Sequence, residues 1–150
     1  DDSSCSVARA LNEVGDWWSL LIVLPAMYGT RRFVDFQQEL GIAKNILCDR
    51  LARLVDNEVL RKVDVGEHGS RFEYRLTEKG RDLFPVVIAL RQWGDKWNPA
   101  PDEAPLDLRD RATGRPIHTV EVQDADGKAL SIRDVFVPEE SLPVRKKNSA

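Results

Sequence analysis

The run AKNILCDRLARLVDNE, residues 43–58, begins with four closely spaced side chains that can bond to base edges: Lys44, Asn45, Cys48 and Asp49. Lysine can bond to guanine O6 and N7, asparagine can pair with adenine N6 and N7, and aspartate can accept from cytosine N4. Such contacts require a helix whose polar side enters the major groove of DNA. The residue types therefore indicate a helix that reads base edges, and a merely solvated polar face is the alternative.

Two short amphipathic helices joined by a glycine turn are predicted to carry these side chains. In FVDFQQEL, residues 33–40, apolar residues fall at i, i+3 and i+7, and Gly41 allows a tight turn. The following run repeats apolar residues on one stripe, so Ala43 joins the four polar side chains on the exposed side. The buried stripe consists of Leu47, Leu51, Leu54 and Val55, with Ile46 beside it. This layout is typical of a helix-turn-helix.

The hydrophobic period then changes from helical spacing to alternation. VLRKVDV and RFEYRLT, residues 59–65 and 71–77, alternate as strands do, and the polar glycine-rich segment 66–70 separates them. A hairpin directly after the second helix is a wing. Its side chains His68, Ser70 and Arg71 are short or basic enough to approach the minor groove or the DNA backbone.

Helices are also predicted before and after this motif. Residues 5–14 form one helix that ends at Gly15, with Val7, Ala8, Leu11 and Val14 on one face. Asp16 caps a buried helix that Pro25 kinks or shortens and Gly29 closes. Thr77 caps a long helix that runs to about Trp97 and bends near Pro85. This last helix is more apolar than one small domain can cover, so it is either a core helix or a dimer seam.

The overall charge does not decide whether the protein binds DNA. The net charge is −3, but residues 30–81 carry 11 basic and 9 acidic side chains and are net positive. The local charge of the binding surface matters more than the total charge, because salt screens the attraction between a basic side chain and a phosphate beyond about 8–10 Å. Arg31 and Arg32 precede the first helix of the motif, where a phosphate can also meet a helix N-terminus. Arg50 and Arg53 are assigned to phosphates or to fixing the second helix.

Several segments in the same order closely resemble the HxlR family of bacterial regulators. They are CSVARALNEVGDWWSLLIV, GTRRFVDFQQELGIAKNILCDRLARL and RFEYRLTEKG, and the likeness covers about residues 5–97. The resemblance implies a winged-helix dimer held by its first and last helices and bound to operators. It leads one to expect a hydroxyl residue where Cys48 stands and a neutral side chain in place of Asp49. A carboxylate beside phosphates is repulsive, so the alternative to a base contact by Asp49 is a salt bridge with Arg53 at i+4.

The two cysteines and the aromatic residues raise the question of an effector. Cys5 stands where the family commonly has a cysteine, which some members use to sense quinones, aldehydes or oxidants. A thiol near a helix N-terminus has a lowered pKa, whereas the simpler alternative is a small residue packed at the dimer interface. A disulfide between Cys5 and Cys48 requires Cα atoms within about 7 Å. Aromatic side chains could line a ligand site, although packing is the favoured reading; these are Trp17, Trp18, Tyr28, Trp93 and Trp97.

The last third of the chain is predicted to be a small β-rich extension. IHTVEV and ALSIRDVFV flank Asp124–Gly127, which is a strong hairpin signal. The segment resembles a zinc-ribbon-like tail of related regulators, but the ligand positions hold Thr113, Gln123 and Asp126, and His118 lies outside the pattern. A structural zinc site needs about four cysteine or histidine ligands, so we expect a ribbon that has lost its metal. It could be a dimer clasp, a pocket cover or simple packing.

The sequence as a whole predicts an α+β fold: a winged helix-turn-helix with a long dimerisation helix and a small β-hairpin C-terminal extension. The predicted parts are residues 1–98, a linker at 99–105, the extension at 106–137 and a loose tail at 138–150. We expect a cytoplasmic, homodimeric, DNA-binding transcriptional regulator, most simply a repressor, with double-stranded operator DNA as partner and a small molecule, electrophile or oxidant as candidate effector. No cofactor, metal site, membrane span or enzymatic constellation is expected. The alternative is a winged-helix module that binds protein instead of DNA.

Overall fold

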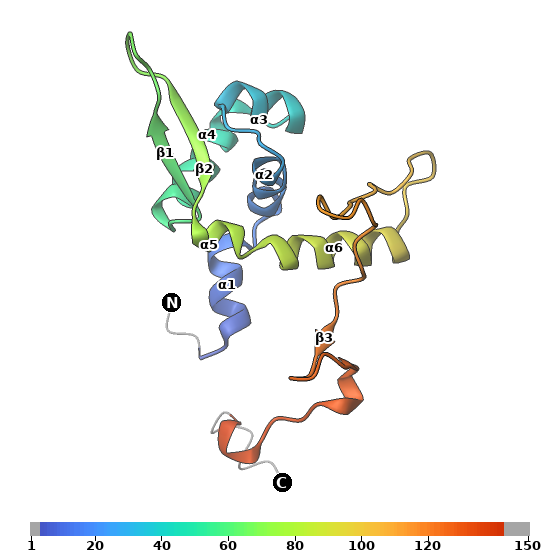
Figure 1. Cartoon of the computed structure of the whole chain (residues 1–150). Coiled ribbons are helices and arrows are strands. Elements are labelled where there is room, and N and C mark those ends of the chain that lie inside the picture. Colours follow the sequence, from blue (N-terminus) through green and yellow to red (C-terminus); the bar gives the residue numbers. More distant parts are fainter. Residues whose placement is uncertain (1–3, 143–150) are drawn as a thin grey trace. The chain divides into compact units, whose positions relative to one another are not determined.

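The computed structural model describes residues 4–142, whose helices and strands are drawn in Figure 1. The chain forms two compact units, Asp1–Val87 and Ile88–Ala150. The first unit contains α1 (Ser6–Val14), α2 (Trp17–Met27), α3 (Phe33–Leu40), α4 (Lys44–Asp56), β1 (Leu60–Asp64), β2 (Phe72–Leu76) and α5 (Glu78–Arg81). The helix α6 (Phe84–Trp97) begins in the first unit and ends in the second. The second unit then continues with β3 (Val122–Gln123), β4 (Ala129–Leu130) and the 3-10 helices η1 (Ile132–Asp134) and η2 (Glu139–Ser141).

The division inside α6 differs from the border after residue 98 that the sequence analysis placed there. Val87, in the first turn of α6, belongs to the core of the first unit. Further along the same helix, the side-chain amide of Gln92 bonds to the extension: its Nε2 donates to the His118 carbonyl at 3.2 Å, and its Oε1 accepts from the Val120 amide at 2.7 Å. The proline-rich linker is therefore not where the packing changes.

The helix-turn-helix forms as its spacing predicts. The helices α3 and α4 are joined at Gly41, whose φ of 62° lies in the left-handed region that favours glycine. Behind the turn, Phe36 on α3 and Leu47, Leu51 and Leu54 on α4 are fully buried. The apolar stripes of both helices thus face inward and leave the polar side of α4 outside.

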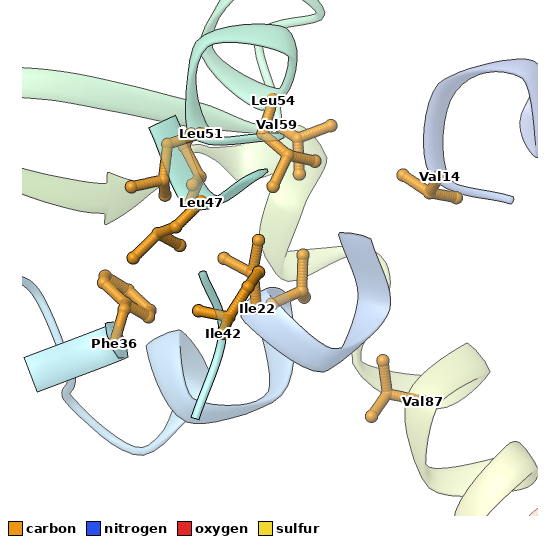
Figure 2. Close-up of a cluster of buried hydrophobic side chains, with 11 residues drawn as sticks. Val14, Ile22, Phe36, Ile42, Leu47, Leu51, Leu54, Val59 and Val87 are labelled. Carbon is orange, nitrogen blue, oxygen red and sulfur yellow. The ribbon is translucent and has the colours of Figure 1, made fainter. Parts of the chain in front are cut away.

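The core of the first unit gathers side chains from its helices and from the base of its wing (Figure 2). Phe36 and the three α4 leucines meet Ile22 of α2, while Val59 and Leu60 close the end beside the sheet. Burying each such side chain contributes about 1.5–3 kcal/mol. Gly80 of α5 is also buried, and a Cβ there would run into the Val59 carbonyl. Only glycine therefore lets α5 pass this close to the start of β1.

The wing is the antiparallel pair β1 and β2, with Leu60 opposite Leu76 and Lys62 opposite Tyr74. The Tyr74 amide also donates to the Arg31 carbonyl at 2.7 Å, which ties the segment before α3 to the sheet. Lys62 Nζ lies 4.3 Å from the centre of the Phe72 ring, so a cation–π contact supports the sheet near the loop.

The long helix predicted from Thr77 to Trp97 is wrong, because α5 and α6 are separate helices. Thr77 does cap α5, since its hydroxyl accepts from the Gly80 amide at 3.0 Å. Pro85 has no amide hydrogen and would clash with the carbonyl four residues earlier, so the first helix cannot continue through it. In the second position of α6, where no amide partner is required, the same proline is tolerated.

On the apolar face of α1, Val14 is buried, while Val7 and Leu11 are exposed. Two further expectations need correction. The extension has the predicted hairpin, but its strands are two residues long and Ile132–Asp134 forms η1, because Ser131 and Asp134 make a capping box there. Within the predicted tail, Glu139–Ser141 forms η2, and residues 143–150 lie outside the described part. In that described part, no helix has the length and apolar character needed to cross a membrane.

Candidate nucleic-acid interface

The outer side of α4 presents all the side chains that were predicted to read DNA. Ala43 is the N-cap residue and is exposed, as are Lys44, Asn45, Cys48 and Asp49. The leucines on the opposite side of the helix are fully buried, so this surface cannot rotate inward without exposing the core. Lys44 and Asn45 occupy the first turn, which is the part of a recognition helix that reaches base edges.

Asp16, Asp49 and Arg50 form a network of hydrogen bonds and ion pairs that links α4 to the start of α2. The carboxylate of Asp16 accepts from the Trp18 and Ser19 amides, both at 3.1 Å, and from Arg50 Nε at 2.9 Å. It also accepts from the Ser19 hydroxyl. Arg50 Nη1 donates to Asp49 as well. A residue that caps α2 is thereby bonded to the helix that carries the candidate reading surface.

The electrostatics of this network favour the charged forms. Burial alone would raise the pKa of Asp16, but the hydrogen bonds from Ser19, Arg50 and the two backbone amides outweigh it and lower the pKa. The bond to Asp16, joined by Asp49, raises the pKa of Arg50. The alternative pairing of Asp49 with Arg53 is not formed: Asp49 pairs with Arg50, and Arg53 is exposed.

The segment before α3 places two arginines beside the motif. Arg31 is exposed, and its guanidinium lies 3.9 Å from Glu73 Oε2, a carboxylate that also pairs with Arg75 at 2.9 Å. Arg32 is the N-cap residue of α3 and is half-buried. The positive charge of Arg31 is thus partly offset by Glu73.

The wing loop is exposed and held by one carboxylate. Asp64 accepts from the Gly66 amide at 2.9 Å and the Arg71 amide at 3.1 Å. The bond from the Arg71 amide, followed by those from Gly66 and the Ser70 hydroxyl, lowers the pKa of Asp64. The backbone at both ends of the loop is therefore fixed, while His68, Ser70 and Arg71 are exposed.

Several basic side chains of this unit keep their charge available. Among the ion pairs of the described residues, none involves Arg32, Lys44, Arg53 or Arg71.

The sequence analysis assigned Asp16 only a capping role and missed its bond to Arg50. No local signal could have revealed that bond, since the two residues are 34 positions apart.

The candidate sensing residues occupy different environments. Cys5 is exposed at the N-cap of α1, and hydrogen bonds from the backbone of Ala8 and then Val7 lower its pKa. Cys48 is exposed, and within the described residues no disulfide joins it to Cys5, so the conceivable Cys5–Cys48 disulfide is not formed. Trp18 packs against the core, whereas Trp17 is 77 % exposed. Tyr28, Trp93 and Trp97 are also exposed.

Within residues 4–142, no group of three or more His, Cys, Asp or Glu side chains is arranged to hold a metal ion.

Comparison with known proteins found a family, relatives and solved structures that this chain resembles. The family described as HxlR-like helix-turn-helix matches residues 13–102. An HTH-type transcriptional regulator of Mycobacterium tuberculosis, Rv3095, is 44 % identical over 109 residues, which are 73 % of this chain and 69 % of that protein. The crystal structure of the candidate transcription factor PA1607 matches with a TM-score of 0.84 and 47 % identity, over 91 % of this chain and 96 % of that one. The redox regulator HypR in its reduced form matches with a TM-score of 0.58 and 26 % identity, over 61 % of this chain and 92 % of that one.

Proposed function

The chain belongs to the HxlR-like helix-turn-helix family, and from that premise we propose that it is a homodimeric repressor whose α4 helices read the major groove. The family and the relatives are transcriptional regulators and not enzymes. The observation that carries the finer proposal is the exposed first turn of α4, where Lys44 and Asn45 stand in front of fully buried leucines. Cys48 and Asp49 follow one turn later on the same side.

The roles within this interface follow from the partners of each side chain. Lys44 and Asn45 contact base edges, with Cys48 beside them. Arg32, Arg53 and Arg71 contact phosphates, because their charge is not neutralised by a described carboxylate. Arg31, His68 and Ser70 flank these contacts. Arg50 fixes the helix, since Asp16 and Asp49 already hold its guanidinium.

The homodimer is supported by apolar side chains that a lone chain leaves in water. On α1 these are Val7 and Leu11, and on α6 they are Phe84, Val86, Leu90, Trp93 and Trp97. Exposed apolar surface of this extent marks an interaction site. Two recognition helices about 34 Å apart would enter successive major grooves. A dimer seated on an operator in the cytoplasm excludes other proteins from that DNA, which is why we propose repression.

Alanine at Lys44 or at Asn45 tests the reading surface. Each change is expected to weaken binding to the duplex upstream of the protein's own gene by about 1–3 kcal/mol, or about 5- to 150-fold. The reason is that each removes a base contact without touching the core. Fluorescence anisotropy measures the affinity, and Lys128→Ala and Asn98→Ala are matched controls at exposed positions of the second unit.

Two outcomes would favour the alternative module that binds protein instead of DNA. One is that no duplex binds even at low salt, and the other is that both α4 variants bind as tightly as the unaltered chain. The net charge of −3 is the observation that favours this alternative.

A response to electrophiles or oxidants is the second part of the proposal. It is supported by the exposed Cys5 at the start of α1, whose lowered pKa favours the reactive thiolate. The likeness to the redox regulator HypR adds to this support. Packing at the dimer interface remains the competing role for Cys5.

The reactivity of Cys5 can be measured in a Cys48→Ser variant. Its alkylation rate with iodoacetamide is expected to reach half of its maximum at a pH below about 8.5, the usual thiol value. The Cys5→Ser variant reports the background rate from Cys48. A midpoint at or above the usual value would leave packing as the role of Cys5.

A further inference from the structure

Residues 106–137, which we call the arm, have a defined backbone but no core of their own. No arm residue is buried, and only Leu108, Asp124 and Leu130 are half-buried. Ile132 is 89 % exposed and Phe136 is 85 % exposed, close to what an unfolded chain would show. Further exposed apolar side chains of the arm are Leu106, Ile117, Val120, Val122, Val135 and Val137.

The backbone of the arm is nevertheless specified at several points. Asp134 Oδ2 accepts from the Ser131 amide at 2.8 Å and from its hydroxyl at 3.1 Å, so η1 is capped and carries Ile132 outward. Arg109 Nη1 donates to the Gly114 carbonyl at 2.9 Å, which closes the first loop of the arm. Ordering a chain costs conformational entropy that buried apolar surface must offset. An ordered arm that buries almost nothing therefore needs a second surface.

We infer that the arm buries its apolar face against a second copy of this chain. The exposed aromatic side chains supply a large share of what such an interface buries, because a fully exposed aromatic side chain offers about 150–250 Å². On that scale Phe136 and the two α6 tryptophans, Trp93 and Trp97, supply roughly 300–550 Å². The aliphatic side chains of the arm add to this area, toward the approximately 800 Å² per partner of a stable interface.

The match to PA1607 covers 91 % of this chain, so it extends beyond residue 102 into the arm, and it covers 96 % of that chain. The match to HypR covers 61 % of this chain and nearly all of HypR. The arm thus recurs as part of a whole chain of similar length.

The inference rests on the proposed homodimer and is tested on the full chain by crosslinking. A photoreactive p-benzoylphenylalanine replaces Phe136 or Ile132 in a chain that carries a small affinity tag. This chain is mixed with unaltered chain that carries a larger tag. We expect covalent dimers that contain both tags, and we expect none when the same group replaces Val34, an exposed residue of α3. Sedimentation of the same samples reports whether dimers form.

The outcomes separate the two proposals. Dimers that give only crosslinks within one chain, or none, would overturn the role of the arm and leave the homodimer intact. A chain that sediments as a monomer at every concentration would overturn both. In support, Ile132→Asp and Phe136→Asp should raise the dimer dissociation constant at least tenfold, because each places a charge in the buried face, whereas Val34→Asp should leave it unchanged. Dissociation constants unchanged by both arm substitutions would also contradict the inference.

Discussion

Phe36→Ala is expected to lower the free energy of unfolding by about 3–5 kcal/mol. Phe36 is fully buried where α3, α4 and α2 meet, so its removal forfeits the transfer free energy of the ring and leaves a cavity that the leucines of α4 cannot fill. Urea unfolding at one fixed protein concentration measures the change, since dimerisation makes stability depend on concentration.

The matched control for this substitution lies two residues away. Val34 is on the same helix but 59 % exposed, so Val34→Ala is expected to change stability by less than about 1 kcal/mol. Equal losses for the two variants would show that α3 does not face the core as described. Because α3 supports α4, the Phe36 variant should also bind DNA less tightly wherever it is partly unfolded.

Asp16→Ala is expected to destabilise the protein by about 2–4 kcal/mol at neutral pH. The substitution removes the cap of α2 and leaves the half-buried guanidinium of Arg50 without one of its two carboxylates. Asp16→Asn separates these effects, because asparagine is as good a cap as aspartate but carries no charge. About half of the loss should therefore return in the asparagine variant. Equal stability of the two variants would show that the charge of Asp16 contributes nothing.

The pH dependence of stability is an independent test of the ion pair between Asp16 and Arg50. Since folding lowers the pKa of Asp16, its contribution is complete above the unfolded value of about 3.9 and is lost as the pH falls through the folded pKa. The stability gap between the unaltered chain and Asp16→Asn should be constant from pH 5 to 7 and shrink below pH 4. A gap that persists undiminished to pH 2 would mean that the charge on Asp16 does not cause it.

Elements that depend on local spacing were predictable from the sequence. The repeats of Phe33, Phe36 and Leu40, the left-handed turn at Gly41 and the alternation of the wing each arise from neighbours within a few residues. The exposed side of α4 followed from the same logic, because its leucine stripe fixes which residues remain outside. The caps at Asp16 and Thr77 were also correct.

Features that depend on distant partners were not predictable. Arg50 bonds to a carboxylate 34 residues away, which changes the partner of Asp49. The break before α6 was misjudged, because Pro85 was expected to bend a helix that it in fact separates from α5. The strands of the arm were overestimated, since alternating apolar residues usually mark a buried face and here they are exposed.

The bonds that hold Arg50 also bear on how binding would respond to ionic strength. Each phosphate that a protein neutralises releases counterions and adds about 0.9 to the slope of log affinity against log salt concentration. An arginine whose guanidinium is already held by Asp16 and Asp49 releases none, which removes about 1.8 from the slope of a dimer. Affinity for DNA would therefore fall less steeply with added salt than the number of arginines on and beside α4 implies.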